Sequence, residues 1–247
     1  METLRWERRD GVGWIFFNRP EVRNAVNLRM MDELEEWIEQ WGSDPTFKVL
    51  VFAGDEKAFV SGGDLEEFRR LTTEEAVFPV MARMGRLLEK VRSLGKPTVA
   101  AVRGTAVGGG CEIAASCDFR VASQQAVFGF VQSRLGITTG WGGGSRLFEQ
   151  LPKSQALYLL LSGKRVDARL LQQWGWIIKL FPEENFLTSV QSFAQELAQA
   201  PAEVIKAYME MASGGWVDPV DREARYCARL WETEEHLRAM DAFLNRS

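Results

Sequence analysis

Three consecutive glycines, a cysteine and a glutamate at residues 108–112 form the stretch of this 247-residue chain with the clearest chemical potential. A largely apolar run at residues 98–102 precedes them, and small helix-forming residues follow. Glycine has no Cβ, so it lets the chain turn sharply and lets a ligand approach the main chain. The first turn of the expected helix has amide N–H groups without intrahelical partners. The junction can therefore bind an anion, or an oxygen that becomes negative during a reaction, with Glu112 beside it.

A second glycine turn occurs upstream, where residues 61–65 read Ser-Gly-Gly-Asp-Leu. Asp64 and Glu67 fit a capping box, which predicts that a helix begins there. Gly63 and Gly109 thus each lie between an expected strand and an expected helix. Two such turns can direct one N–H each at a common point, which is the arrangement of an oxyanion hole.

Several other kinds of chemistry are excluded by what the chain lacks. Its only histidine, His236, lies in a charged segment near the end and is interpreted as a surface residue. Serine-histidine-aspartate hydrolysis and zinc hydrolysis both usually depend on histidine. The glycine run contains neither the lysine of a phosphate-binding loop nor the G-x-G-x-x-G dinucleotide pattern. Chemistry must therefore depend on carboxylates and backbone amides.

Composition describes an ordinary globular protein, with 46% hydrophobic residues, 26% charged residues and a net charge of -4. No basic tract indicates a nucleic-acid partner, and no apolar run reaches the ~20 residues of a membrane span. The three cysteines, Cys111, Cys117 and Cys227, suggest neither a disulfide framework nor a metal site. We expect no metal and a reducing, cytoplasmic location.

The sequence predicts a series of strands and helices in which one unit is repeated. A hairpin is predicted around Asp10-Gly11, a helix that begins at the N-cap Asn27, a strand at residues 48–53 and a helix at residues 74–94. A strand-strand-helix unit that repeats after about 46 residues predicts an α/β spiral rather than a doubly wound nucleotide fold.

Two regions are expected in this organisation. Residues 1–182 form the spiral core, and residues 183–247 form a helical C-terminal subdomain for oligomerisation. The apolar residues of that subdomain are expected to be buried between subunits: Phe186, Val190, Phe193, Leu197, Tyr226 and Trp231.

Residues 108–112, together with Cys117-Asp118, resemble the crotonase (enoyl-CoA hydratase/isomerase) superfamily, whose members act on coenzyme A thioesters. Three further blocks match in the family's order: residues 18–25, 58–65 and 142–147. The resemblance implies a crotonase-like spiral and an acyl-CoA lyase that works through an enolate. It also implies no cofactor beyond the coenzyme A moiety of the substrate, and a homotrimer or homohexamer.

The resemblance assigns roles residue by residue. Gly63 and Gly109 match the two oxyanion donors, and Glu112 matches the first of the two glutamates that act in the family's hydratases. Gln132 stands where the hydratases have the second glutamate. The positions that contact coenzyme A are matched by four residues: Val22, Arg23, Ala25 and Ser61.

Gln132 leaves the reaction open, because an amide can form hydrogen bonds but cannot take a proton. The region around it is also similar to the ethylmalonyl-CoA/methylmalonyl-CoA decarboxylase branch, in which loss of CO₂ gives the same enolate without a base. Gln132, Ser133 or Arg134 would then hold the leaving carboxylate, and decarboxylation is expected to outpace hydration. Trp141 either closes the acyl pocket or belongs to the core. A third reading is a non-catalytic coenzyme A-binding or scaffold protein that kept the fold.

Overall fold

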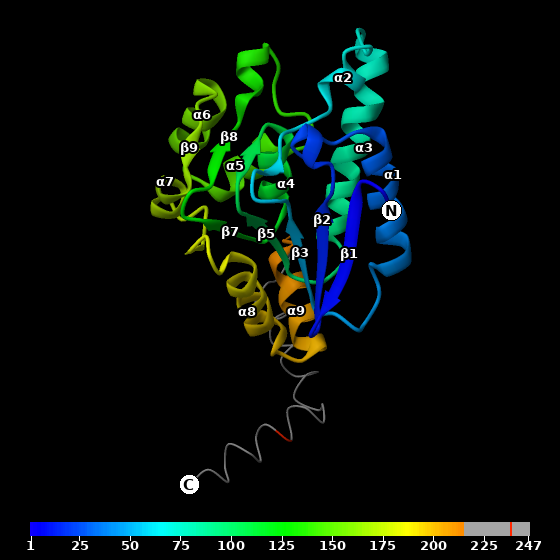
Figure 1. Ribbon diagram of the computed structural model, residues 1–247, viewed down its shortest axis with the longest axis vertical. Coiled ribbons are helices and arrows are strands. Elements are labelled where there is room, and N and C mark those ends of the chain that lie inside the picture. The colour runs from blue at the N-terminus through cyan, green and yellow to red at the C-terminus, as the bar shows by residue number, and fades with distance from the viewer. Residues whose placement is uncertain (215–237, 239–247) are drawn as a thin grey trace.

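The computed structural model describes residues 1–214 and residue 238, so His236, Cys227, Tyr226 and Trp231 lie outside the described residues. Two sheets organise the described part (Figure 1). The large sheet contains, in spatial order, β1 (Leu4–Arg9), β2 (Val12–Phe17), β3 (Val49–Ala53), β5 (Thr98–Val102), β7 (Phe119–Ser123) and β10 (Lys179–Phe181). The small sheet contains β4 (Ala58–Val60), β6 (Thr105–Val107), β8 (Val127–Gly129) and β9 (Val166–Asp167).

Helices connect and cover these strands. They are η1 (Pro20–Val22), α1 (Leu28–Trp41), α2 (Leu65–Phe68), α3 (Glu74–Arg92), α4 (Gly109–Ser116), η2 (Val131–Leu135), α5 (Gly143–Gln150), α6 (Lys153–Ser162), α7 (Ala168–Gln173), α8 (Phe186–Ala198) and α9 (Ala202–Ala212). The predicted N-caps are confirmed: Asn27 accepts from the amide of Met30, and Asp64 accepts from the amides at the start of α2. The reciprocal bond of the capping box is not formed, because the Asp64 amide donates to the oxygen of Val26 and not to Glu67.

Three successive segments of chain each contribute one strand to each sheet: β3 and β4, then β5 and β6, then β7 and β8. Within each sheet these strands pair in parallel, whereas β1 and β2 form the predicted antiparallel hairpin. A segment that returns to the same two sheets on every pass is a turn of a spiral. The predicted α/β spiral is thereby confirmed.

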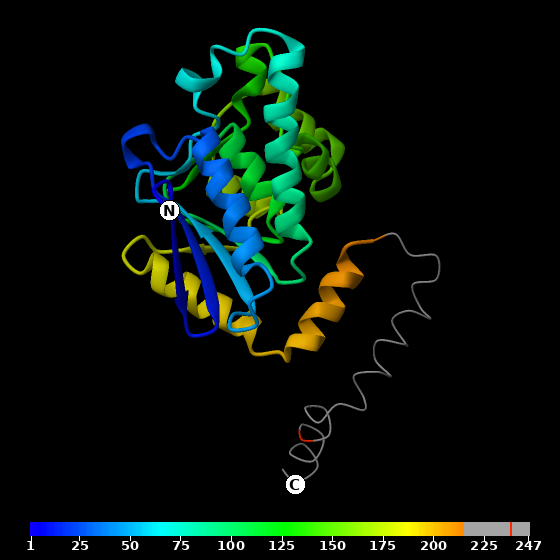
Figure 2. The ribbon, with the colours of Figure 1, turned by 90° about the vertical axis from the view of Figure 1, so that its right-hand side faces the viewer.

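The inner strands β2, β3 and β5 of the large sheet are buried on both faces, as strands between two covering layers usually are. In β3, Leu50 and Phe52 face the core beneath α1 and α3, whereas Val49 and Val51 face the opposite cluster. Figure 2 shows α1 and α3 side by side on one side of the sheet. Both apolar faces of the sheet must be shielded from water, and α8 covers the second face.

The position of α8 corrects one expectation. Its residues Phe186, Val190 and Phe193 are buried against Trp14 and the other outward-facing residues of the large sheet, within the same chain. A hydrogen bond of 2.7 Å from the Trp14 indole to the Gln191 side chain fastens the helix to the hairpin. The prediction that these three residues lie between subunits was wrong, because they cover an apolar sheet face that would otherwise be exposed. The oligomerisation role of residues 183–247 stays a prediction.

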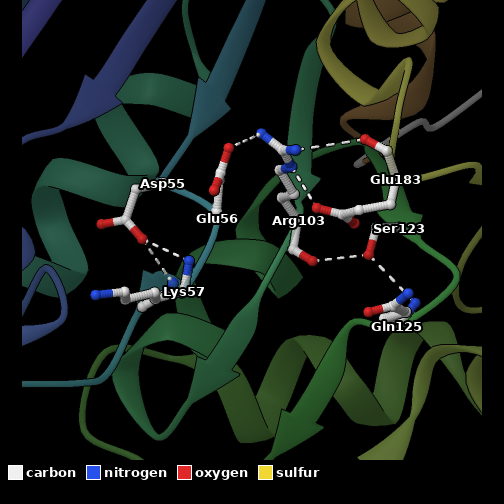
Figure 3. A network of polar contacts seen from close by, with 8 residues as sticks. Asp55, Glu56, Lys57, Arg103, Ser123, Gln125 and Glu183 are labelled. Atoms are coloured by element: carbon white, nitrogen blue, oxygen red, sulfur yellow. Dashed lines mark hydrogen bonds and ion pairs between the residues drawn. The ribbon is translucent and has the colours of Figure 1, made fainter.

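Arg103 holds together the corners where the chain passes from the large sheet to the small one (Figure 3). Its guanidinium binds Glu56, from the connection between β3 and β4, and Glu183, just before α8. Its backbone oxygen accepts a 2.7 Å hydrogen bond from Ser123 at the end of β7. Consecutive turns of the spiral are therefore fixed relative to one another on the side where α8 begins.

Candidate active site

The strand-to-helix junction of β6 and α4 depends on its glycines. Gly108 has a φ of 56°, in the left-handed region that glycine adopts without steric cost. A Cβ at Gly110 would lie 2.0 Å from the backbone oxygen of Val60, so only glycine allows α4 to pack so closely against β4. The junction thus brings the start of α4 next to the turn that follows β4.

The two predicted oxyanion residues lie on these adjacent turns. A Cβ at Gly62 would be 3.5 Å from the amide nitrogen of Gly109, which shows how near the turns are. Val26 binds the oxygen of Gly62 and the amide of Asp64, each at 2.8 Å, and so holds the Gly63 peptide between them. Within the described part of the chain, the N–H groups of Gly63 and Gly109 donate no hydrogen bond. Such unpaired amides are what an oxyanion hole requires, although their role stays a prediction.

Glu112 is 2% exposed, and its carboxylate accepts four hydrogen bonds. Oε1 accepts from the Gln132 side chain at 2.9 Å and from the amide of Gly140 at 3.3 Å. Oε2 accepts from the amides of Trp141 at 2.7 Å and Gly143 at 2.9 Å. Burial raises the pKa of Glu112, and these four donors offset part of that rise. The carboxylate is therefore held in place by the loop that precedes α5.

Gln132 is the residue of the η2 segment that faces the site. It is 8% exposed and donates to Glu112, whereas its Oε1 is buried and accepts no hydrogen bond from any described residue. Ser133 and Arg134 are exposed instead; Ser133 bonds the backbone oxygen of Leu161, and Arg134 lies against Gly163. Of the three candidates for contact with substrate, only Gln132 lies beside Glu112.

Trp141 has the core role, since it is 3% exposed and belongs to the core cluster, whereas its role in closing an acyl pocket stays a prediction. Its indole also lies against both predicted oxyanion residues. A Cβ at Gly109 would be 2.0 Å from Cζ3 of the ring, and one at Gly63 would be 3.7 Å from Cζ2. The buried Arg146 donates to the Trp141 carbonyl oxygen at 2.8 Å and pairs with Glu89.

Sequence reasoning missed the residues that anchor this loop, namely Gly140, Gly143 and Arg146. One signal was present in the second glycine run, residues 142–144. A Cβ at Gly143 would lie 2.4 Å from Cγ of Glu112, so that glycine permits the carboxylate to approach the backbone. The run indicates a second close approach of the kind seen at residues 108–110.

The four predicted coenzyme A-contacting residues also lie together. The amide of Ser61 donates to the oxygen of Arg23 at 3.1 Å, and the Ser61 hydroxyl donates to the oxygen of Val22 at 3.3 Å. Ala25 is buried beneath this turn, and the buried Asn24, which sequence reasoning missed, bonds Arg19 and Ala58. Arg23 is exposed and has no acidic partner among the described residues. Contact with coenzyme A stays a prediction.

The described residues can be searched directly for a metal site and for a membrane-spanning helix. No group of three or more histidine, cysteine, aspartate or glutamate side chains is placed to hold a metal ion there. None of the helices described is long and apolar enough to cross a membrane.

A family model described as enoyl-CoA hydratase/isomerase matches residues 7–245. The chain belongs to the enoyl-CoA hydratase/isomerase family. A probable enoyl-CoA hydratase of Mycobacterium tuberculosis is 32% identical over 250 residues, covering 99% of this chain and 96% of that protein. A crotonyl-CoA hydratase of Syntrophomonas wolfei is 30% identical, with coverage of 99% and 96%. The crystal structure of an enoyl-CoA hydratase from Bacillus anthracis has a TM-score of 0.93 at 27% identity and covers 99% of this chain and 96% of that one.

Membership of the enoyl-CoA hydratase/isomerase family makes this chain an enzyme of that family and confirms the resemblance found in the sequence. Family membership does not by itself explain the glutamine at residue 132. At the position that the resemblance assigns to the hydratases' second glutamate, this chain has an amide whose NH₂ group already binds the Glu112 carboxylate. The question left for function is what the free oxygen of that amide can hold.

Proposed function

We propose that this enzyme hydrates 2-enoyl-CoA thioesters. The observation that carries the proposal is the buried Oε1 of Gln132, which lacks a donor although its own amide group lies 2.9 Å from Glu112. A buried acceptor left unpaired costs about 1–3 kcal/mol, so a ligand that donates a hydrogen bond is favoured there. Water is such a donor, and it is the second substrate of hydration.

The proton transfers balance with a single carboxylate. A water held by Gln132 attacks C3 of the enoyl group while the thioester oxygen becomes negative at the amides of Gly63 and Gly109. Glu112, ionised at the start, takes a proton from that water and returns it to C2. Of the two Glu112 oxygens, Oε1 is the better placed to take this proton. Its bond from the Gly140 amide, at 3.3 Å, is longer than the amide bonds of 2.7 and 2.9 Å to Oε2.

Decarboxylation is disfavoured by the charges at the same place. A malonyl-type carboxylate beside Gln132 would face the unpaired Oε1, which is an acceptor, and the ionised Glu112. Like charges and facing acceptors repel. No lysine or arginine of the described residues bonds to Glu112 or Gln132, and Arg134 lies elsewhere. These charges support hydration ahead of decarboxylation, the reverse of the order expected from the sequence.

Further parts of the proposal depend on the family and the composition. We expect a homotrimer or homohexamer in the cytoplasm that needs no metal or redox cofactor beyond the coenzyme A moiety of its substrate. The exposed Arg23 supports a coenzyme A site, since a guanidinium without an acidic partner can bind a phosphate.

The decisive experiment measures kcat/KM for crotonyl-CoA hydration and for CO₂ release from methylmalonyl-CoA under the same conditions. Hydration is expected to be the faster reaction, and Glu112→Gln should lower it by about 10²-fold or more, as loss of a general acid-base does. Ser133→Ala is the control, because Ser133 is exposed and bonds away from the site. Faster CO₂ release would establish the decarboxylase, and coenzyme A thioester binding without turnover would establish the non-catalytic protein.

A further inference from the structure

The proposed proton transfers do not use the Trp141 side chain, yet its ring lies against both predicted oxyanion residues. Its six-membered ring lies against the Cα of Gly109, since a Cβ there would be 2.0 Å from Cζ3 and 2.4 Å from Cη2. The same ring reaches Gly63, whose Cβ would be 3.7 Å from Cζ2. One side chain therefore lines both residues that would hold the thioester oxygen.

The backbone of Trp141 is held on both sides, and its indole is packed within the core cluster. The Trp141 amide donates to Oε2 of Glu112 at 2.7 Å, and its carbonyl oxygen accepts from Arg146 at 2.8 Å. Arg146 is 4% exposed and paired with Glu89, so it cannot easily move. Displacing Trp141 would break bonds to the one carboxylate that the proposed reaction needs. The ring is accordingly a fixed boundary of the site and does not open.

Other apolar side chains close the space around the same two turns. The ring of Phe68 lies against Gly63, where a Cβ would be 2.7 Å from Cε2. Met81 lies against Gly140, where a Cβ would be 3.1 Å from Sδ. Both side chains pack against the core cluster that contains Trp141. These apolar contacts narrow the space beside the two predicted oxyanion residues and Gly140.

We infer that Trp141 sets the upper limit on acyl length and restricts the enzyme to short-chain thioesters of about four carbons. The inference rests on the proposed function for its substrate class. A chain bound at the two amides with its C2 and C3 beside Glu112 must continue past the fixed indole. Trp141 thus determines specificity without taking part in proton transfer.

The test compares kcat/KM for 2-enoyl-CoA substrates of four and eight carbons. Wild type is expected to prefer the four-carbon substrate, and Trp141→Ala should shift the ratio toward eight carbons by about 10-fold or more, since a single methylene in an apolar pocket is worth at least that. Trp141→Phe, which retains a ring, should keep most of the wild-type ratio. Trp174→Ala is the matched loss of an indole, because Trp174 packs on Tyr158 of α6, and it should leave the ratio unchanged.

Binding of unreactive S-butyl- and S-octyl-CoA thioethers, measured by calorimetry, gives the same comparison without catalysis. If no variant hydrates any enoyl-CoA, the proposed function fails while the thioether ratio still tests the boundary. A wild type that prefers eight carbons over four overturns the inference, and this needs no variant to fold. An unchanged ratio in folded Trp141→Ala, when Trp174→Ala is also neutral, overturns it as well.

Discussion

Gly109→Ala tests the contact between Trp141 and the start of α4 without removing the amide that the proposed oxyanion hole uses. Gly109 has no positive φ, so alanine fits its backbone, and the N–H is retained. The added Cβ would lie 2.0 Å from Cζ3 of Trp141, much closer than two carbons can approach. The indole cannot retreat freely, because it is packed in the core cluster and Glu112 and Arg146 hold its backbone on both sides.

The expected magnitude follows from overpacking. Inserting a methyl group into a packed core costs about 1–3 kcal/mol, and the fixed Trp141 favours the upper part of this range. Trp141→Ala alone should cost about 3–5 kcal/mol, because it leaves a cavity. In that background the methyl group at residue 109 has space, so Gly109→Ala should cost almost nothing there. The double-mutant cycle should therefore give a coupling of about 1–3 kcal/mol.

The measurement is the free energy of unfolding in urea for the wild type, both single variants and the double variant. Gly110→Ala is the control, because its Cβ would meet the backbone oxygen of Val60 at 2.0 Å and not the indole. Trp141→Ala should not rescue it. If Gly109→Ala costs the same with and without Trp141, the indole does not lie against Gly109 and the inferred boundary loses its basis.

Two further predictions concern carboxylates. Gln132→Glu would place a second carboxylate beside Glu112, whose pKa is already raised by burial. Because like charges raise the pKa of one of the pair, the pH below which kcat/KM falls should be higher in the variant than in the wild type. An unmoved pH profile would contradict the contact between residues 112 and 132. Glu33, fully buried, accepts from the amides of Glu2, Thr3 and Leu4, which holds its pKa below the usual value. Glu33→Gln should cost about 1–3 kcal/mol at neutral pH. That cost should shrink as pH falls through the lowered pKa, because protonated Glu33 loses the same bonds; a pH-independent difference in unfolding free energy would refute the assignment.

Local signals in the sequence predicted the elements well. The Asp10-Gly11 turn, the N-caps Asn27 and Asp64 and the strand at residues 98–102 all occur where the pattern placed them. These features depend on a few neighbouring residues, whose φ preferences and hydrogen bonds are the same in any fold. The recurrence of the strand-strand-helix unit then sufficed to predict the spiral.

Long-range packing could not be predicted in the same way. The apolar stripe of α8 has the same pattern whether it covers a sheet or a second subunit, and only the unfilled face of the large sheet decides between them. The anchoring of Glu112 by residues 140–143 involves backbone amides, which every residue except proline possesses. That Gln132 rather than Ser133 faces Glu112 likewise depends on how the η2 segment lies relative to α4.

The arrangement makes acid-base chemistry and pocket shape one structural unit. Glu112 is held through the amide of Trp141, so the residue proposed to transfer the proton and the residue inferred to limit the acyl group share a hydrogen bond of 2.7 Å. A substitution that shifts the loop before α5 should therefore change rate and chain-length preference together, whereas a change confined to the indole ring should alter preference alone. Because Arg146 binds the other side of the same residue, its loss should produce the combined effect although it touches neither Glu112 nor the two predicted oxyanion glycines.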